Sequence, residues 1–283
     1  MRKFQPFSLN IKGKLTEIER PQVMGILNVT PDSFFEDSRT FDCDKISNRI
    51  DTMLDEGVDI IDIGAYSSRP GADDVKPHEE MQRLEMAMNL IAQKNISIPI
   101  SVDTFRADVA HFAINSLGAN IINDISAGLL DDAMIETVAQ LKVPYIAMHM
   151  RGTPSTMNSQ VDYNNITADV IYELSKRINK LTLSGVNDII IDPGFGFAKT
   201  IDQNYELLSN LEALHDLGYP LLVGISRKSM IYRALDISPK EALNGTSVLN
   251  TLALQAGASF LRVHDVKPAV EAVKLMTLTN KYL

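Results

Sequence analysis

Several side chains that could bind or polarise a small molecule follow short apolar stretches of this chain. Four carboxylates and amides end separate stretches: Asp62, Asp103, Asn123 and Asp192. Aspartates alone would suit a hard cation, but Asn123 and the nearby Lys228 favour another ligand. A buried carboxylate can accept two parallel hydrogen bonds from an amino-pyrimidine edge, while a lysine donates to the opposite side of the ring. These residues therefore predict a site for such a ring.

A second, mostly basic set of side chains indicates an anion site. Asn28, Arg69, Arg262 and His264 follow the first, second and last apolar stretches, which adjoin one another if the strands close into a barrel. Arginine forks suit phosphate oxygens, and loops near the last strands of such barrels often hold phosphate. We therefore expect a phosphorylated substrate. The alternative is that Arg262 and His264 pair with Asp265 or another neighbour.

Eight apolar, β-branched runs position these residues. They cover residues 23–27, 58–61, 98–102, 120–122, 143–148, 188–191, 220–224 and 258–261. Strands buried on both faces have continuous apolar runs, and the carboxyl ends of parallel strands face the ligand. The pattern predicts an α/β fold, a single (β/α)8 TIM barrel with its site where the runs end.

Helical periodicity fills the intervals between the runs. It predicts helices from Pro77 to Ile91 and over 44–56, 107–117, 131–141, 166–183, 205–217 and 241–255. Residues 7–11 and 15–18 alternate around Gly13, which indicates a β-hairpin. We expect this extension, residues 1–20, to cover the amino-terminal mouth of the barrel. Because one such barrel takes about 250 residues, we expect a single domain over 1–283.

Composition excludes several classes of protein. The net charge of −9 argues against general binding to nucleic acid or anionic membranes, since the mean field repels phosphate. Cys43 is the only cysteine, so neither an intrachain disulfide nor a multi-thiolate zinc site is possible. No run approaches the roughly 20 apolar residues of a membrane span, and the first residues lack the apolar segment of a signal peptide. We expect a cytoplasmic protein.

Two long loops follow the first and second runs, at residues 28–38 and 66–73. Long loops at the functional mouth of a barrel are usually lids or substrate clamps. The first contains Phe34 and Phe35, adjacent aromatics in a polar segment. An aromatic substrate is the simplest cover for their apolar surface.

Seven motifs, in order along essentially the whole chain, closely resemble the dihydropteroate synthase family. They are NVTPDSF at 28–34, SRPG at 68–71, VDT at 102–104, IND at 122–124, DPGFGF at 192–197, SRKS at 226–229 and RVHD at 262–265. The resemblance implies a (β/α)8 barrel that joins 6-hydroxymethyl-7,8-dihydropterin pyrophosphate to para-aminobenzoate and releases pyrophosphate. This is the folate-pathway step that sulfonamides block.

The resemblance also implies a role for each matched residue. The pterin would lie among Asp103, Asn123, Asp192, Lys228, Phe197 and Met148. Pyrophosphate would contact Asn28, Arg69, Arg262 and His264, with Asn28 also holding Mg²⁺. Aminobenzoate would contact Phe34, Ser68, Pro70, Lys228 and Ser229. Catalysis would depend on Asp103, Lys228, Asn28 and Arg262.

One segment departs from the family pattern. The second loop of the family usually reads Gly-Glu-Ser-Thr-Arg-Pro, whereas this chain has Gly64-Ala65-Tyr66-Ser67-Ser68-Arg69-Pro70. Ser68 keeps a hydroxyl but lacks the threonine methyl, which bears on aminobenzoate binding. The implied mechanism is dissociative: pyrophosphate leaves, Asp103 stabilises the cationic pterin, and the neutral amine attacks.

Three other functions remain open at this point. A corrinoid-linked pterin methyltransferase has a similar barrel, but the first-loop motif and residues 226–229 favour the synthase. A Schiff-base aldolase would need an apolar pocket around Lys228, which instead has Arg227 and carboxylates nearby. A catalytically silent pterin-binding protein would bind without turnover.

The apolar late helices, with the resemblance, imply a homodimer.

Overall fold

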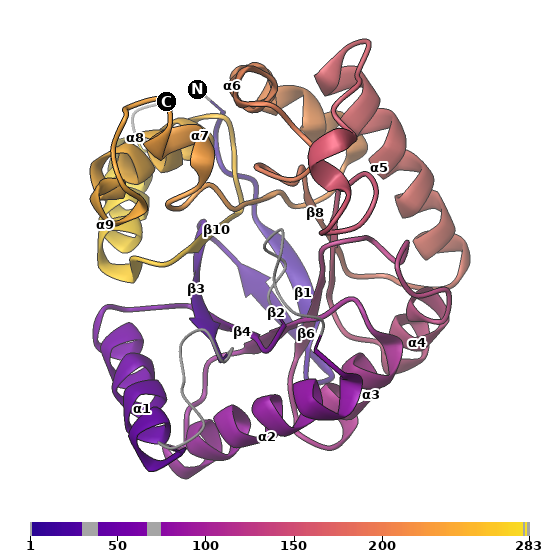
Figure 1. Ribbon diagram of the computed structural model, residues 1–283, viewed down its shortest axis with the longest axis vertical. Helices are drawn as coiled ribbons and strands as arrows, with labels where there is room; N and C mark the ends of the chain where they lie inside the picture. Colours follow the sequence, from indigo (N-terminus) through magenta and orange to yellow (C-terminus); the bar gives the residue numbers. More distant parts are fainter. Residues whose placement is uncertain (1, 30–38, 67–74, 280, 282–283) are drawn as a thin grey trace.

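Eight parallel strands form the centre of the molecule, and helices surround them (Figure 1). The computed structural model describes residues 2–29, 39–66, 75–279 and 281. Within these ranges the strands are β3 (Gln22–Asn28), β4 (Ile60–Gly64), β5 (Ile100–Asp103), β6 (Ile121–Asp124), β7 (Tyr145–Met148), β8 (Ile189–Asp192), β9 (Leu222–Val223) and β10 (Phe260–Val263). Their spatial order is β8-β7-β6-β5-β4-β3-β10-β9.

The two ends of this strand order meet and close the barrel. Ile191 forms an isolated parallel bridge with Leu221, and its N–H donates to Pro220 O over 2.9 Å. Consecutive strands are therefore neighbours around the whole circle, with β10 between β9 and β3. This arrangement confirms the predicted (β/α)8 barrel.

Several strands begin later than the apolar runs that predicted them. The second run begins at Val58, but β4 begins at Ile60, because the connection from the preceding helix takes up the first residues of the run. Val58 is buried in that connection, and its N–H donates to Met53 O over 3.0 Å. As a result, residues predicted to follow the strands, such as Asp62 and Arg262, lie within them.

The outer ring agrees with most of the predicted helices. Its α-helices are α1 (Arg39–Asp55), α2 (Pro77–Gln93), α3 (Ala107–Asn115), α4 (Met134–Leu141), α5 (Ile166–Leu183), α6 (Ile201–Ser209), α7 (Ser229–Tyr232), α8 (Leu243–Gln255) and α9 (Val266–Thr279), with 3-10 turns η2 (Met157–Ser159), η3 (Leu211–Leu217) and η4 (Pro239–Glu241). The helix expected over 205–217 is divided between α6 and η3. Asn210 marks the division, because its side chain donates to Glu206 O over 2.8 Å and competes with the backbone.

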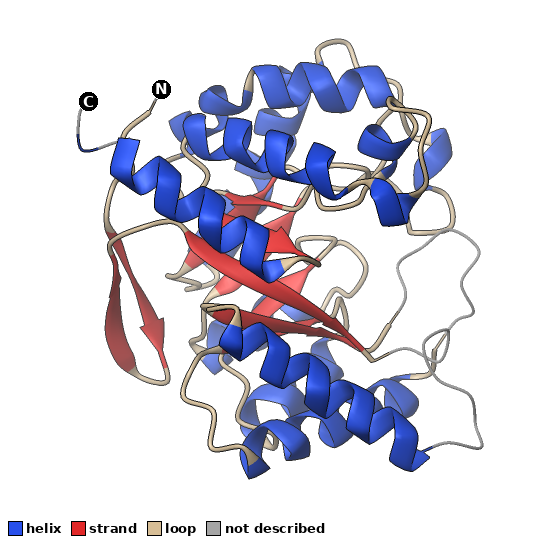
Figure 2. Ribbon diagram, turned by 90° about the vertical axis from the view of Figure 1, so that its left-hand side faces the viewer, coloured by secondary structure: helices blue, strands red, loops and turns tan. Residues whose placement is uncertain are grey.

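The predicted hairpin is present and covers the amino-terminal mouth. β1 (Phe7–Ile11) pairs antiparallel with β2 (Lys14–Ile18). The two turn residues, Lys12 and Gly13, both have positive φ, which is typical of a type I′ turn. Apolar side chains of the hairpin pack with Met24, Ile60, Ile146 and other inward-facing residues at the strand starts. In Figure 2 the hairpin lies on the side opposite to the strand arrowheads.

The main core lies between the barrel and its helices. It includes residues of every barrel strand and of all the helices α1 to α9. No described helix combines the length and the apolar character needed to cross a bilayer. The carboxyl ends of the strands are thus held by a continuous packed ring, which gives the side chains there fixed positions.

Candidate active site

The carboxyl ends of neighbouring strands bring several predicted residues into one row. The register aligns Asn28 with Gly64, Gly64 with Asp103, and Asp103 with Asn123. The absence of a side chain at Gly64 keeps this row open, because a Cβ there would lie 3.2 Å from Asn28 Oδ1 and 3.9 Å from Asp103 Oδ2. Asn28 and Asp103 therefore flank the same gap.

Arg262 joins two carboxylates across the mouth of the barrel. Its Nε donates to Asp62 Oδ2 over 2.7 Å, and its Nη2 donates to Asp103 Oδ2 over 2.6 Å. Asn123 Nδ2 donates to the same Asp62 oxygen over 3.1 Å. Asp62 is fully buried, and its Oδ1 has no hydrogen-bond partner among the described residues. The Arg262 guanidinium thus neutralises the negative charge of Asp62 and Asp103 inside the mouth. Asp103 is also one of the carboxylates predicted to bind the ring of the ligand.

Asp192 and Lys228 interact electrostatically on the other side of the mouth. Asp192 is buried, and its Oδ1 accepts a hydrogen bond from Gly194 N over 2.7 Å. Lys228 Nζ donates to Phe195 O and lies 4.9 Å from the centre of the Phe197 ring. Burial lowers the pKa of Lys228 to about 8, and the negative charge of Asp192 opposes this shift. Burial raises the pKa of Asp192, which Lys228 in turn opposes.

Met148 and Phe197, the predicted apolar walls, belong to one small cluster. This cluster contains Ile125 and Met150, with Phe197 packed against it at its edge. Met148 is opposite Asp192 in the register of β7 and β8. The structure therefore places an apolar surface beside the carboxylates, as binding of a flat polar ring requires.

His264 belongs to the mostly basic set predicted to bind an anion, but its surroundings disfavour a positive charge. Its ring Nδ1 lies 3.0 Å from Ser226 Oγ, and its backbone N–H donates to the same oxygen over 3.1 Å. Burial, together with the positive charge of Arg262, lowers the pKa of His264 to about 4. The ring is thus neutral near pH 7 and offers a hydrogen bond rather than a fixed charge.

Asp265 does not pair with Arg262, but the alternative that Arg262 pairs with a neighbour is confirmed, because Arg262 forms salt bridges with Asp62 and Asp103. Arg227 holds Asp265 with two parallel bonds, from Nε to Oδ2 over 2.7 Å and from Nη2 to Oδ1 over 2.9 Å. Arg262 is directed to Asp62 and Asp103 instead. The two arginines, both near strand ends, therefore have separate partners and separate tasks.

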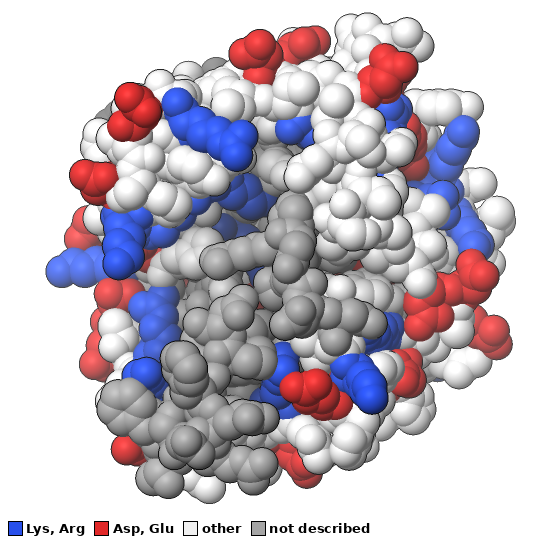
Figure 3. Space-filling model, in the orientation of Figure 1, with Lys and Arg blue, Asp and Glu red and all other residues white. Residues whose placement is uncertain are grey.

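Four predicted residues lie outside the described part of the chain: Phe34, Ser68, Arg69 and Pro70. Ser229, also predicted to contact aminobenzoate, is the first residue of α7 and follows Lys228, which caps that helix. On the face that carries the mouth, Lys and Arg side chains surround the centre while Asp and Glu lie mostly toward the edge (Figure 3). The local field there is more favourable to an anion than the net charge suggests.

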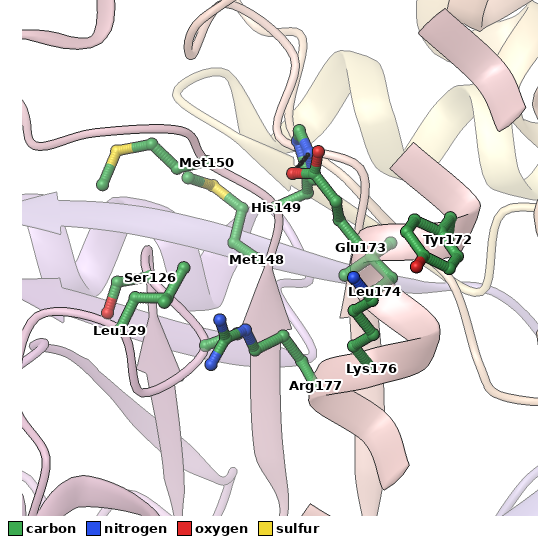
Figure 4. Close-up of a pocket in the computed structure, with 11 residues that line it drawn as sticks. Ser126, Leu129, Met148, His149, Met150, Tyr172, Glu173, Leu174, Lys176 and Arg177 are labelled. Atoms are coloured by element: carbon green, nitrogen blue, oxygen red, sulfur yellow. Dashed lines mark hydrogen bonds and ion pairs between the residues drawn. The ribbon is translucent and has the colours of Figure 1, made fainter. Parts of the chain in front are cut away.

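A cavity of about 270 Å³ lies beside this site rather than in it. It is bounded by the β6 and β7 ends and by α5 (Figure 4), with Ser126, Met148, His149, Glu173 and Arg177 among its lining residues. Of the predicted site residues that the structure describes, only Met148 is in that lining. We assign the candidate site to the barrel mouth, because the mouth and not this cavity gathers the carboxylates, Lys228 and Arg262.

The family resemblance assigned no role to Asp62 or Ser226, although each contacts a residue to which it did assign one. Asp62 was recognised as a strand-end carboxylate, and its position inward on β4 could have suggested a partner for a basic residue. Ser226 stands in the SRKS motif, but nothing local indicates that its hydroxyl bonds to His264. Both contacts depend on the closure of the barrel.

The stability of the protein should reveal the unusual ionisation of Asp103. Burial raises the pKa of Asp103 from 3.8 to about 7, although Arg262 lowers it. The folded protein therefore retains a proton in this window that the unfolded chain has lost, and ionisation costs stability as the pH rises. We expect Asp103→Asn to avoid this cost, so its free energy of unfolding relative to wild type should rise between pH 4 and pH 7. Urea unfolding across this range would measure the difference, and parallel profiles for the two proteins would refute the shift.

Known proteins of one family match this chain over most of its length. Residues 24–264 match the family of pterin binding enzymes. A dihydropteroate synthase of Haemophilus influenzae is 40% identical over 273 residues, which cover 96% of this chain and 98% of the relative. The chain belongs to the dihydropteroate synthase family. It is accordingly a transferase of folate biosynthesis, as the sequence motifs implied.

Solved dihydropteroate synthases share the whole fold. That of Yersinia pestis, in complex with a sulfonamide drug, is 37% identical and has a TM-score of 0.90, covering 97% of this chain and 100% of its own. That of Xanthomonas albilineans, in complex with 7,8-dihydropteroate, is 33% identical with a TM-score of 0.83, covering 96% and 98%. Similarity of this extent includes the barrel, the hairpin and the strand ends that carry the candidate site.

Proposed function

We propose that this dihydropteroate synthase family member binds 6-hydroxymethyl-7,8-dihydropterin pyrophosphate in the barrel mouth and condenses it with para-aminobenzoate. The products are 7,8-dihydropteroate and pyrophosphate. The observation that carries the proposal is that a half-buried carboxylate, Asp103, and a buried one, Asp192, interact with the positive charges of Arg262 and Lys228 at one mouth. The X. albilineans relative, which binds 7,8-dihydropteroate, supports it.

The pterin ring would contact residues that differ in what they can donate or accept. Asp192 and Asp103 would accept from its amine and ring N–H groups, and Lys228 would donate to its oxygen or nitrogen. Asn123 can do either, because its amide has both a donor and an acceptor. Phe197 and Met148 would cover the faces of the ring. For the pterin to bind Asp103, Arg262 would have to share this carboxylate with the ring or release it.

Pyrophosphate would bind beside the ring, at Arg262, His264, Asn28 and Arg69. Among the described residues no group of three or more His, Cys, Asp or Glu side chains could hold a metal alone. Mg²⁺ commonly takes only one or two protein oxygens and completes its shell with water and substrate phosphates. The exposed amide of Asn28 fits such a site, and the ion would supply charge neutralisation for the leaving group.

The reaction would proceed by departure of pyrophosphate before attack of the amine. The bond between the exocyclic methylene carbon and the phosphate oxygen breaks, and its electron pair leaves with pyrophosphate. Arg262 stabilises that negative charge, while ionised Asp103 stabilises the cation spread into the pterin. The nitrogen of para-aminobenzoate then forms the new bond to the methylene carbon and loses a proton. No general base is needed, because the neutral amine meets a strong electrophile.

Aminobenzoate would bind last, against Lys228, Ser229 and the two loops that contain Phe34, Ser68 and Pro70. Sulfonamides would compete for this position, as the sulfonamide complex of the Y. pestis relative suggests. Ordered binding is expected because loop closure must follow pyrophosphate.

We also propose a homodimer. α8 exposes Leu243, Val248 and Leu252, and Leu275 of the adjoining helix α9 is 66% exposed. Large apolar side chains gathered on neighbouring helices are typical of an interface. The cytoplasmic location expected from the sequence stays a prediction.

Turnover tests the proposed function. Purified protein with Mg²⁺, the pterin pyrophosphate and para-aminobenzoate should yield dihydropteroate and pyrophosphate in equal amounts, and should yield neither without Mg²⁺. Chromatography and a coupled pyrophosphate assay would measure both products. Tight pterin binding without product would contradict the synthase reaction and favour a methyltransferase or a silent pterin-binding protein.

A further inference from the structure

A buried lysine outside the predicted site holds the segment that carries Phe197. Lys199 is only 9% exposed. Its Nζ lies 3.0 Å from His149 Nδ1 and donates to Gly194 O over 3.0 Å and to Phe197 O over 3.1 Å. An ammonium group has three N–H donors, so these three acceptors satisfy it completely.

The histidine that accepts from Lys199 is itself fixed by a chain of polar contacts. Burial lowers the pKa of His149 to about 4, so its ring is neutral near pH 7. With Nδ1 as acceptor, Nε2 carries the proton and donates to Glu173 Oε2 over 3.0 Å (Figure 4). Glu173 Oε1 in turn accepts from Arg151 Nε over 2.9 Å. The orientation of Lys199 thus depends on α5 through an unbroken series of hydrogen bonds.

The segment between Gly194 and Phe197 connects Lys199 to Lys228. Lys199 binds the carbonyls at both ends, while Lys228 binds the carbonyl of Phe195 between them. Gly194 lets the segment approach the end of β7 closely, because a Cβ at this position would lie only 2.0 Å from His149 O. Its conformation therefore sets where the Phe197 ring and Lys228 Nζ lie relative to each other, 4.9 Å apart.

We propose that Lys199 is a positioning residue for the pterin site, holding residues 194–197 so that Phe197 and Lys228 together face the ring. It touches neither substrate in this account, and acts through the two carbonyls. The inference rests on the proposed function, because it assigns Phe197 and Lys228 to the pterin.

The charge of Lys199 should matter as well as its shape. Burial lowers its pKa to about 7; Asp192 and Glu173 oppose the shift, while Lys228 and Arg151 add to it. A neutral amine has one N–H fewer, so the three contacts are complete only in the protonated form. Removing the charge of Glu173 should lower the pKa of Lys199, whereas Glu173 is not among the groups that shift Lys228.

Lys199→Met tests the positioning role directly. We expect the dissociation constant and the KM for dihydropterin pyrophosphate to rise about tenfold, the value of one lost hydrogen bond to a charged group, with kcat changed by no more than about twofold. Calorimetry without aminobenzoate would measure binding alone. Lys180→Met, which removes an exposed lysine from α5, is the matched control and should leave both constants unchanged.

Glu173→Gln provides a second variant if Lys199→Met does not fold. As the pH rises, affinity for dihydropterin pyrophosphate should fall in both proteins, and in Glu173→Gln the fall should begin at a lower pH than in wild type. Loss of a merely structural contact would not shift the pH at which affinity falls. Unchanged affinity in folded Lys199→Met, or superimposable pH profiles for wild type and Glu173→Gln, would overturn the role of Lys199 alone. Failure of wild type to bind the pterin pyrophosphate would overturn the proposed function and this inference with it.

Discussion

Asp192→Asn should reduce affinity for dihydropterin pyrophosphate by about 100-fold, corresponding to the roughly 1.5 to 3 kcal/mol of a hydrogen bond to a charged group. The carboxylate is buried at the carboxyl end of β8, with Lys228 as its main compensating charge. In the variant, one carboxylate oxygen becomes an NH₂ group that faces the donors of the ring. The other oxygen can still accept from Gly194 N, so the local turn should survive.

Asp188→Asn is the appropriate control for this loss. Asp188 lies just before β8, at the opposite mouth, where its Oδ1 accepts from Asn10 N over 3.2 Å. The same chemical change there should leave pterin affinity at the wild-type value in a calorimetric titration. If Asp192→Asn also binds within a few-fold of wild type, Asp192 does not bind the pterin.

Arg262→Met should lower the free energy of unfolding by about 3 kcal/mol, the cost of leaving a buried charge without its partner. Arg262 is 20% exposed and compensates Asp62, which has no exposed surface, and Asp103. Methionine fills much of the arginine volume, so the loss reflects charge more than a cavity. The variant should also lose turnover, because the leaving group loses one of the cations that would neutralise its charge.

Two further variants separate the electrostatic effect from a general loss of packing. Arg20→Met breaks a surface pair, in which Arg20 is 46% exposed, and should cost only about 0.5 kcal/mol. Adding Asp62→Asn to Arg262→Met should restore part of the lost stability without restoring turnover. Urea unfolding would measure all four proteins, and an Arg262→Met loss no larger than that of Arg20→Met would refute the buried network.

The fold could be predicted from the sequence because the strands bury both faces. All eight apolar runs became strands, and the bounds expected for α5, 166–183, are those observed. The helix α9 was not predicted, although Val266, Ala269 and Val273 are buried on one face. Strand starts were less accurate, since apolar residues such as Val58 are buried in the connections before the strands as well.

The partners of the site residues were harder to predict than the residues themselves. Arg262 and Asp62 are 200 positions apart and meet only because β10 closes the barrel beside β3. The neutral state of His264 follows from burial and from nearby Arg262, neither of which a strand-end pattern shows. Lys199 was overlooked because its role depends on a carbonyl and a histidine that come from two different strand ends.

The position of bound dihydropterin pyrophosphate tests the central claim most directly. A crystal structure with this substrate and Mg²⁺, without aminobenzoate, should show the ring within hydrogen-bonding distance of Asp103, Asn123 and Asp192, with pyrophosphate at Arg262 and His264. A ring bound elsewhere, such as in the cavity beside α5, would contradict the assignment of the barrel mouth as the active site.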